Sequence, residues 1–189
     1  MLRIGLCLLL LGNTSVAWSA WYSHFGYGLQ AGVFRIAEPD DRTFYQSDVS
    51  LLNLSYRIDI NRYYTYMNQI SLNTLNIASN EQHIGQRIDY REISTGVERQ
   101  FRLARQVESG LGIGVGISQT DYSRRHRVDS DGYLVQRLDD RQQIETSLNL
   151  SARLFRKLRR GGMGINLRSA LPLNGGMGYL LGGLEITGR

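Results

Sequence analysis

The stretch GLGIGVGISQ, residues 110–119, places a glycine at every second position from 110 to 116, with aliphatic residues between them. A dinucleotide-binding loop instead needs the spacing GxGxxG at the start of a helix, with an acidic residue further on. A strict period of two puts alternate residues on opposite faces of a β-strand. The stretch therefore predicts a strand with one bulky apolar face and one nearly bare face.

The same period of two runs along most of the chain. Alternating apolar residues predict strands, here at 24–36, 48–60, 62–78, 87–100, 105–119, 138–155, 161–171 and 176–187. Eight is the number of strands at which a small up-and-down barrel closes. We therefore predict an all-β fold, an eight-stranded antiparallel barrel.

The joins between these strands alternate in length. Short joins fall at Asn61, 101–104 and 156–160, and longer ones at 37–47, 79–86, 121–137 and 172–175. Outer-membrane barrels have short periplasmic turns at one end and longer external loops at the other. This alternation favours a transmembrane barrel with its short joins in the periplasm.

Periodicity alone does not say which face points inward. A soluble periplasmic barrel of the lipocalin kind would bury the apolar face, for example Leu111, Ile113, Val115 and Ile117. The interior of an eight-stranded barrel has little room, however, and such residues from every strand would overfill it. Glycines suit a crowded lumen, so we expect the apolar faces to contact lipid.

The amino terminus predicts export. Arg3, the apolar run 4–11 and small residues near 15–19 make a secretory signal peptide of residues 1–19, cleaved near 17–20. A membrane-spanning helix would need about 20 apolar residues. Residues 20–189 then form one domain, located in the outer membrane. Because Cys7 is the only cysteine and lies in the signal peptide, we expect no disulfide and no thiolate-bound metal in it. No metal-ligand spacing stands out, and we expect no cofactor.

The charge balance is basic, at +5, and falls to +4 without Arg3. For an exported chain, this favours outer-membrane lipid or an anionic polysaccharide as partner. The sequence lacks the basic runs interleaved with stacking aromatics that single-stranded nucleic acid requires. We expect no nucleic-acid partner.

Several charged residues fall on the predicted inner face. A buried charge without a partner is very costly, so arginine and glutamate should pair across the lumen. Such a network is either a plug that closes the barrel or a gate in a narrow channel for small solutes. Its predicted members are Arg57, Asp59, Glu98, Glu108, Glu145, Arg153, Arg168 and Glu185.

Basic residues also cluster at both ends of the strands. Arginine suits the phosphates of lipopolysaccharide, and aspartates beside the longest cluster allow a self-paired hairpin instead. A second basic group faces the periplasm, where anionic headgroups, an acidic partner or solvent would meet it. The loop arginines are Arg87, Arg91, Arg124, Arg125 and Arg127; the periplasmic turn has Arg156, Lys157, Arg159 and Arg160, near Arg99, Arg102 and Arg105.

Aromatic residues near strand ends predict the girdles of a membrane barrel, although tyrosine also favours strands in general. These residues are Phe25, Tyr27, Tyr63, Tyr64, Tyr90, Phe101, Phe155 and Tyr179.

In this architecture the chain resembles the small outer-membrane barrels typified by the OmpA transmembrane domain and OmpX, and more loosely the OmpW-like proteins. The resemblance implies insertion by the barrel assembly machinery, which commonly reads a terminal aromatic residue. This chain ends GGLEITGR, without that aromatic.

Some similar barrels modify lipid A with a histidine, a serine and an acid near the outer rim. His83 with Ser79 and Glu81, and His126 with Ser123 and Asp121, are the candidates here. Neither neighbourhood matches those enzymes, so we expect a non-enzymatic barrel. Its expected role is structural or surface-interacting, with a mostly closed polar lumen and loops that contact lipopolysaccharide or other surface anions.

Overall fold

The computed structural model describes residues 23–36, 44–80, 83–159 and 161–188. The predicted signal peptide, Pro39, Glu81 and Arg160 lie outside these ranges. Within the described residues, no helix has the length and hydropathy needed to cross a membrane.

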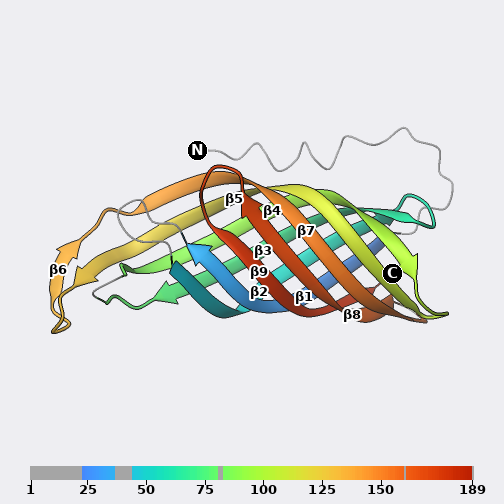
Figure 1. Ribbon diagram of the computed structural model, residues 1–189, viewed down its shortest axis with the longest axis horizontal. Helices are drawn as coiled ribbons and strands as arrows, with labels where there is room; N and C mark the ends of the chain where they lie inside the picture. The colour runs from blue at the N-terminus through green and yellow to red at the C-terminus, as the bar shows by residue number, and fades with distance from the viewer. Residues whose placement is uncertain (1–22, 37–43, 81–82, 160, 189) are drawn as a thin grey trace.

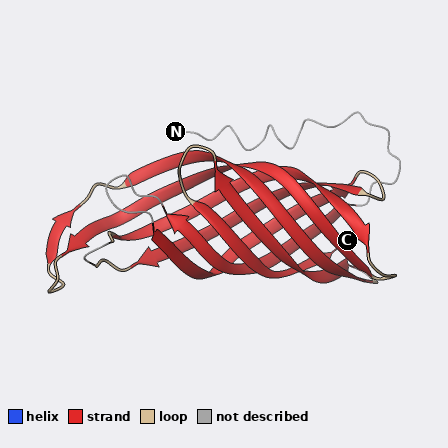
Figure 2. Ribbon diagram, viewed as in Figure 1, coloured by secondary structure: helices blue, strands red, loops and turns tan. Residues whose placement is uncertain are grey.

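The described chain is built from antiparallel strands (Figures 1 and 2). In chain order these are β1 (Ser23–Ile36), β2 (Phe44–Asp59), β3 (Tyr64–Ile77), β4 (Gly85–Arg102), β5 (Val107–Val128), β6 (Leu134–Arg137), β7 (Arg141–Leu158), β8 (Gly161–Pro172) and β9 (Gly178–Gly188). Each pairs with its neighbours in the order β4-β3-β2-β1-β9-β8-β7-β5, and β4 pairs with β5. The predicted eight-stranded up-and-down barrel is confirmed, with β6 as an extra strand beside β5.

The joins sort to the two ends of the barrel. Residues 60–63, 103–106 and 159 lie at one end, which we call the turn end, on the right in Figure 1. The join at 173–177 and β6 lie at the opposite end, which we call the loop end. Asn61 shapes the first turn, because its side-chain oxygen accepts the backbone N–H groups of Tyr63 (2.8 Å) and Tyr64 (3.0 Å).

The apolar faces point outward from the barrel, as predicted. On β5, Leu111, Ile113 and Ile117 are 59%, 58% and 60% exposed. Equivalent residues on the other strands continue this apolar belt. Side chains of opposite parity fill the lumen, and most of them are buried.

The glycines of β5 are needed because side chains of the neighbouring strands cross above them. A Cβ atom on Gly110 would lie 2.5 Å from the carboxyl carbon of Glu98. One on Gly116 would lie 2.5 Å from Asn149 Nδ2 and 2.6 Å from Glu92 Oε1. The bare face of the opening stretch therefore provides the room in which β4 and β7 side chains meet.

The predicted loop 121–137 is mostly strand. β5 continues to Val128, turns, and returns as β6, in a hairpin like the self-paired alternative. Asp129 fixes the turn by accepting the N–H groups of Asp131 (3.0 Å) and Tyr133 (2.8 Å), and Gly132 adopts a φ of 82°. The sequence prediction missed these strands because both of their faces carry mostly polar residues. Without alternating apolar residues, the pattern used to predict strands is absent.

Candidate functional site

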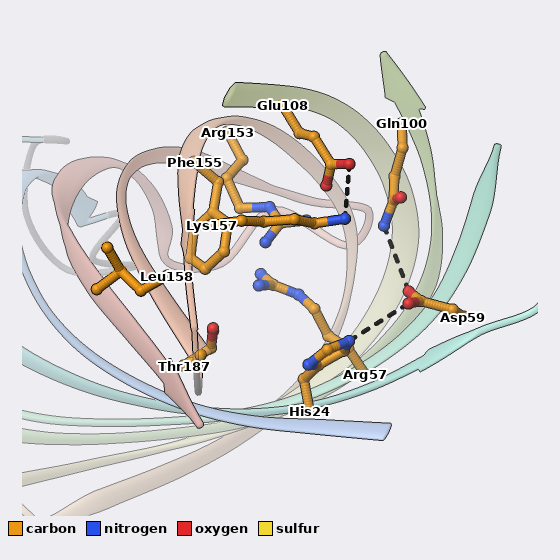
Figure 3. Close-up of a pocket in the computed structure, with 11 residues that line it drawn as sticks. His24, Arg57, Asp59, Gln100, Glu108, Arg153, Phe155, Lys157, Leu158 and Thr187 are labelled. Atoms are coloured by element: carbon orange, nitrogen blue, oxygen red, sulfur yellow. Dashed lines mark hydrogen bonds and ion pairs between the residues drawn. The ribbon is translucent and has the colours of Figure 1, made fainter. Parts of the chain in front are cut away.

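The lumen opens at the turn end into a small polar cavity of about 80 Å³ (Figure 3). Asp59 accepts a hydrogen bond from Thr65 Oγ1 (3.0 Å) and lies 3.3 Å from His24 Nε2. Glu108 pairs with Lys157, whose Nζ is 2.7 Å away. These two acids of the predicted network therefore pair with His24 and Lys157 and not with arginine. Lys157, expected on the periplasmic turn, bends toward the mouth of the lumen.

Deeper inside, Arg57 on β2 and Glu185 on β9 form a buried ion pair. Arg57 Nη1 lies 2.7 Å from Glu185 Oε1, and its Nη2 donates to Oε2 at 3.1 Å. Ser55 and Asn166 donate to the same carboxylate at 2.9 and 3.2 Å. Both oxygens of the Glu185 carboxylate are thus satisfied, while Arg57 Nε has no hydrogen-bond partner among the described residues. These contacts offset part of the cost of burying the charge.

A second buried pair crosses the glycine strand. Arg153 on β7 reaches over β5 to Glu98 on β4, with 2.6 Å between Nη2 and Oε1. The Arg153 guanidinium also lies 4.8 Å from the ring centre of Phe155. Because β5 has Gly110 and Gly112 at this level, its two neighbours pair directly.

Halfway along the lumen, Arg168 binds both hydroxyl and carboxylate groups. It donates to Ser71 (2.8 Å) and Ser94 (3.3 Å), and its Nη2 lies 3.6 Å from Glu92 Oε2. The Tyr179 hydroxyl donates to the same oxygen of Glu92. Arg168 is 2% exposed and Glu92 is 1% exposed.

The sequence prediction missed Glu92, although its signal was present. Glu92 has the same parity as Glu98 along β4, so strict alternation places both inward. Ser147 and Asn149 donate to its other oxygen at 3.1 and 2.9 Å, above Gly116. Glu92 therefore joins β4 to β7 and β8.

The loop half of the lumen contains a mainly apolar cluster, beside the buried polar side chains of Thr120 and Glu145, where the prediction was a mostly polar lumen. Phe34, Tyr90 and Tyr179 pack with ring centres 5.8 to 6.2 Å apart. Tyr90, Tyr179 and Phe155 were expected in the lipid-facing girdles, but their parity turns them inward. This aromatic plug also contains Ile36, Leu75, Ile88, Tyr122, Ala170, Met177 and Leu181.

Glu145 has a different partner from the one predicted. It is 3% exposed, and its Oε2 accepts the backbone N–H of Met177 at 2.9 Å. Met177 belongs to the join between β8 and β9 and to the aromatic plug. Glu145 thus holds this join against the loop half of the lumen, in place of the predicted pair with an arginine.

The predicted loop arginines lie on strands, Arg87 and Arg91 on β4 and the other three on β5, and they are divided between exposed and interior positions. Arg91 and Arg124 are exposed, while Arg87 pairs with Asp89 at 3.2 Å and Arg127 is half-buried. Arg125 is only 6% exposed and donates to the Asp139 carbonyl at 3.0 Å, so it is not the free anion ligand expected. The φ of 56° at Arg124 interrupts the alternation and turns the next residue inward.

Of the arginines predicted on the periplasmic turn, Arg156 lies on the last part of β7 and Arg159 lies on the turn itself, and both are exposed. Arg160 falls outside the described residues. Since Lys157 is engaged by Glu108, the free charge of this turn comes from arginine.

The serines of the two candidate catalytic trios hydrogen-bond to the backbone. Ser79 Oγ lies within donating distance of the His83 and His126 carbonyls, at 3.4 and 3.2 Å. Ser123 donates to the Arg87 carbonyl at 3.5 Å. The acceptors that the structure gives these two hydroxyls are backbone carbonyl groups.

Comparison with known proteins identifies the fold. No family model matches the sequence, and no curated protein matches it. Neisserial surface protein A has a TM-score of 0.59 at 9% identity, covering 87% of this chain and 96% of that chain. Ail, the attachment invasion locus protein of Yersinia pestis, has a TM-score of 0.53 at 15% identity, covering 87% and 97%. Ail in complex with the heparin analogue sucrose octasulfate also matches, with a TM-score of 0.53 at 13% identity, covering 88% and 98%.

These chains share the closed antiparallel architecture described above, although their sequence identity to this chain is only 9% to 15%. The predicted resemblance is therefore confirmed at the level of fold: the chain has the fold of the small outer-membrane β-barrels.

Proposed function

We propose that the protein is a non-enzymatic outer-membrane barrel with a closed lumen and a loop end that interacts with surface anions, lipopolysaccharide above all. The observation that carries this proposal is the outward apolar belt. Large aliphatic side chains such as Leu29, Ile113, Ile144 and Leu184 are more than half exposed on four different strands. A surface of this kind is stable in lipid and not in water.

The side chains that fill the lumen favour a closed barrel and not an open channel. Buried ion pairs fill the turn half and the aromatic plug fills the loop half. An eight-stranded barrel has just enough interior to be filled in this way. We expect no stable conductance in planar bilayers, and a reproducible single-channel step would instead favour the channel.

Two exposed arginines toward the loop end, Arg91 on β4 and Arg124 on β5, support anion binding at the outer surface. Arg91 and Arg124 are free of the buried contacts that engage Arg125. Guanidinium groups bind phosphate and sulfate oxygens through paired hydrogen bonds, and Ail, which shares this fold, was crystallised with a sulfated sugar. The chemistry required is therefore available at the loop end.

Binding to purified lipopolysaccharide tests this part of the proposal. We expect affinity to fall steeply with added salt and in the variant R91Q/R124Q. The matched control R35Q/R137Q removes the same charge from two other exposed residues of the loop end. Equal losses in both variants would show a nonspecific effect of net charge.

Location and closure are tested by gel mobility of the outer-membrane fraction, with and without boiling. A folded membrane barrel resists detergent until heated, so the unboiled protein should migrate differently. Recovery in the soluble periplasmic fraction, with no shift, would contradict the proposal. Mass spectrometry of lipid A, with and without the protein, tests the enzymatic alternative, and we expect no change.

A further inference from the structure

Exposed arginines surround much of the turn end. They come from the three turns and from the adjacent ends of β4 and β7, and every one of them is exposed. We call this set the arginine collar: Arg62, Arg99, Arg102, Arg105, Arg156 and Arg159.

No exposed carboxylate balances the collar among the described residues of the turn end. Asp59 and Glu108 are the acids nearest to it, and they bind His24 and Lys157 at the mouth of the lumen. The loop end differs, because exposed aspartates such as Asp131 and Asp140 accompany its arginines. The described residues of the turn end therefore carry an uncompensated positive charge.

The collar lies at the edge of the apolar belt. Arg99 points outward on β4 between Val97 and Phe101, and its guanidinium lies 5.2 Å from the Phe101 ring centre. Arg156 points outward on β7 between Leu154 and Leu158, which are 47% and 51% exposed. Side chains at this position have their stems against the hydrocarbon and their charges at headgroup depth.

The turns themselves are amphipathic. Leu103 is 62% exposed beside Arg102, and Tyr63 is 49% exposed with the Arg62 guanidinium 4.5 Å from its ring centre. Exposed apolar and aromatic groups next to cations are typical of a membrane interface. A purely solvated turn gains nothing from Leu103.

We propose that the arginine collar binds the phosphate groups of anionic phospholipids in the leaflet that surrounds the turn end. The proposal rests on the membrane placement proposed above. Guanidinium groups bind phosphate oxygens in pairs, and an anionic headgroup adds a net attraction that a zwitterionic headgroup lacks. The collar would thereby fix the depth and orientation of the barrel from the periplasmic side.

Spin-label electron paramagnetic resonance tests this selectivity directly. Protein reconstituted in phosphatidylcholine vesicles is probed with spin-labelled phosphatidylglycerol or phosphatidylcholine, which gives their relative affinity for the barrel surface. We expect wild type to prefer phosphatidylglycerol, and the variant R99Q/R156Q to lose at least about fivefold of that preference. A second variant, R105Q/R159Q, alters only turn residues and should show a loss in the same direction.

The matched control is R35Q/R137Q, which removes two exposed charges from the loop end. It should keep the wild-type preference. An equal loss of lipid preference in the control and collar variants would overturn the proposal. A preference that all variants retain would also overturn it, and would favour an acidic macromolecule as the partner of the collar. The heat-dependent gel shift is recorded for every sample, so a failure of membrane insertion is distinguished from a failure of lipid selectivity.

Discussion

The two halves of the lumen are closed by different chemistry, although the same alternation of side chains builds both. In the turn half, Arg57 pairs with Glu185 and Arg153 with Glu98, beside a small cavity at the mouth. In the loop half, Phe34 and its neighbours pack without charge. Tyr179 joins the halves, because its ring belongs to the plug and its hydroxyl donates to Glu92.

This difference indicates which changes each half tolerates. A buried charge is stable only while its partner remains, so loss of one partner should be more damaging than loss of the pair. An apolar cluster loses stability in proportion to the volume removed. The turn half should therefore depend on matched partners, and the loop half on filled space.

The largest expected effect is in the turn half. Glu185→Ala leaves Arg57 without its carboxylate and removes the acceptor of Ser55 and Asn166. We expect the free energy of unfolding to fall by about 4 kcal/mol. Urea unfolding of the barrel in lipid vesicles, followed by the heat-dependent gel shift, measures this change.

The double variant Arg57→Met/Glu185→Leu separates the pair from its members. Because it removes both charges together, most of the lost stability should return. If the double variant is as unstable as Glu185→Ala, the loss of stability does not arise from an unpaired charge. The proposed difference between the two halves of the lumen is then wrong.

The next effect is in the loop half. Ile88 is fully buried in the aromatic plug, and Ile88→Ala should lower the free energy of unfolding by about 3 kcal/mol. Ile93 lies on the same strand but faces outward and is 41% exposed. The same urea titration should show a clearly smaller loss for Ile93→Ala; equal losses would mean that the plug is not packed as described.

A smaller effect is expected at the glycine strand between the halves. Gly110→Ala would place a methyl group 2.5 Å from the Glu98 carboxyl carbon and so displace its pair with Arg153. Crowding of this kind costs about 2 kcal/mol. Gly182→Ala is the control, because the nearest atom to its Cβ would be 3.7 Å away. Indistinguishable midpoints for the two variants would contradict the account of β5.

Much of this comparison could be predicted from alternation. Alternation in eight segments predicted the barrel, and the glycines of β5, together with the limited interior of such a barrel, predicted which face points outward. Parity also placed Arg57, Arg153 and Glu185 in the lumen, because each lies two or four residues from other inward positions. These predictions depend only on neighbours along one strand.

The remaining features depend on neighbours across strands. That Arg153 reaches Glu98 over β5, or that Glu145 accepts the N–H of Met177, follows from register and strand order. The aromatic plug was not predicted. Tyr90 and Tyr179 were assigned to the lipid-facing girdles because they lie near strand ends, although alternation along their strands places them inward. Arg125 points inward because the left-handed backbone of Arg124 shifts the alternation by one residue. Such a shift cannot be recognised from the sequence period.

The smallest expected effect is outside the lumen, above the apolar belt at the loop end. There Thr74 Oγ1 donates to Asp89 Oδ1 at 2.6 Å, and this hydrogen bond, with the nearby Arg87, holds the pKa of Asp89 below its ordinary value. Thr74→Val should raise that pKa toward the ordinary range, whereas Thr74→Ser keeps the hydroxyl and should leave it low. A carboxylate-selective NMR titration measures both.

The sign of the pH dependence follows from that shift. A carboxyl group with a lowered pKa stabilises the fold above its unfolded-state pKa, and this stabilisation disappears as pH falls through the folded-state value. Wild type should therefore exceed Thr74→Val in stability at neutral pH and converge with it in acid. Convergence at high pH instead would show that the hydrogen bond favours the protonated carboxyl. The Thr74–Asp89 pair faces water, whereas the ion pairs of the turn half are buried. The change in the free energy of unfolding in Thr74→Val should therefore be far smaller than the change in Glu185→Ala.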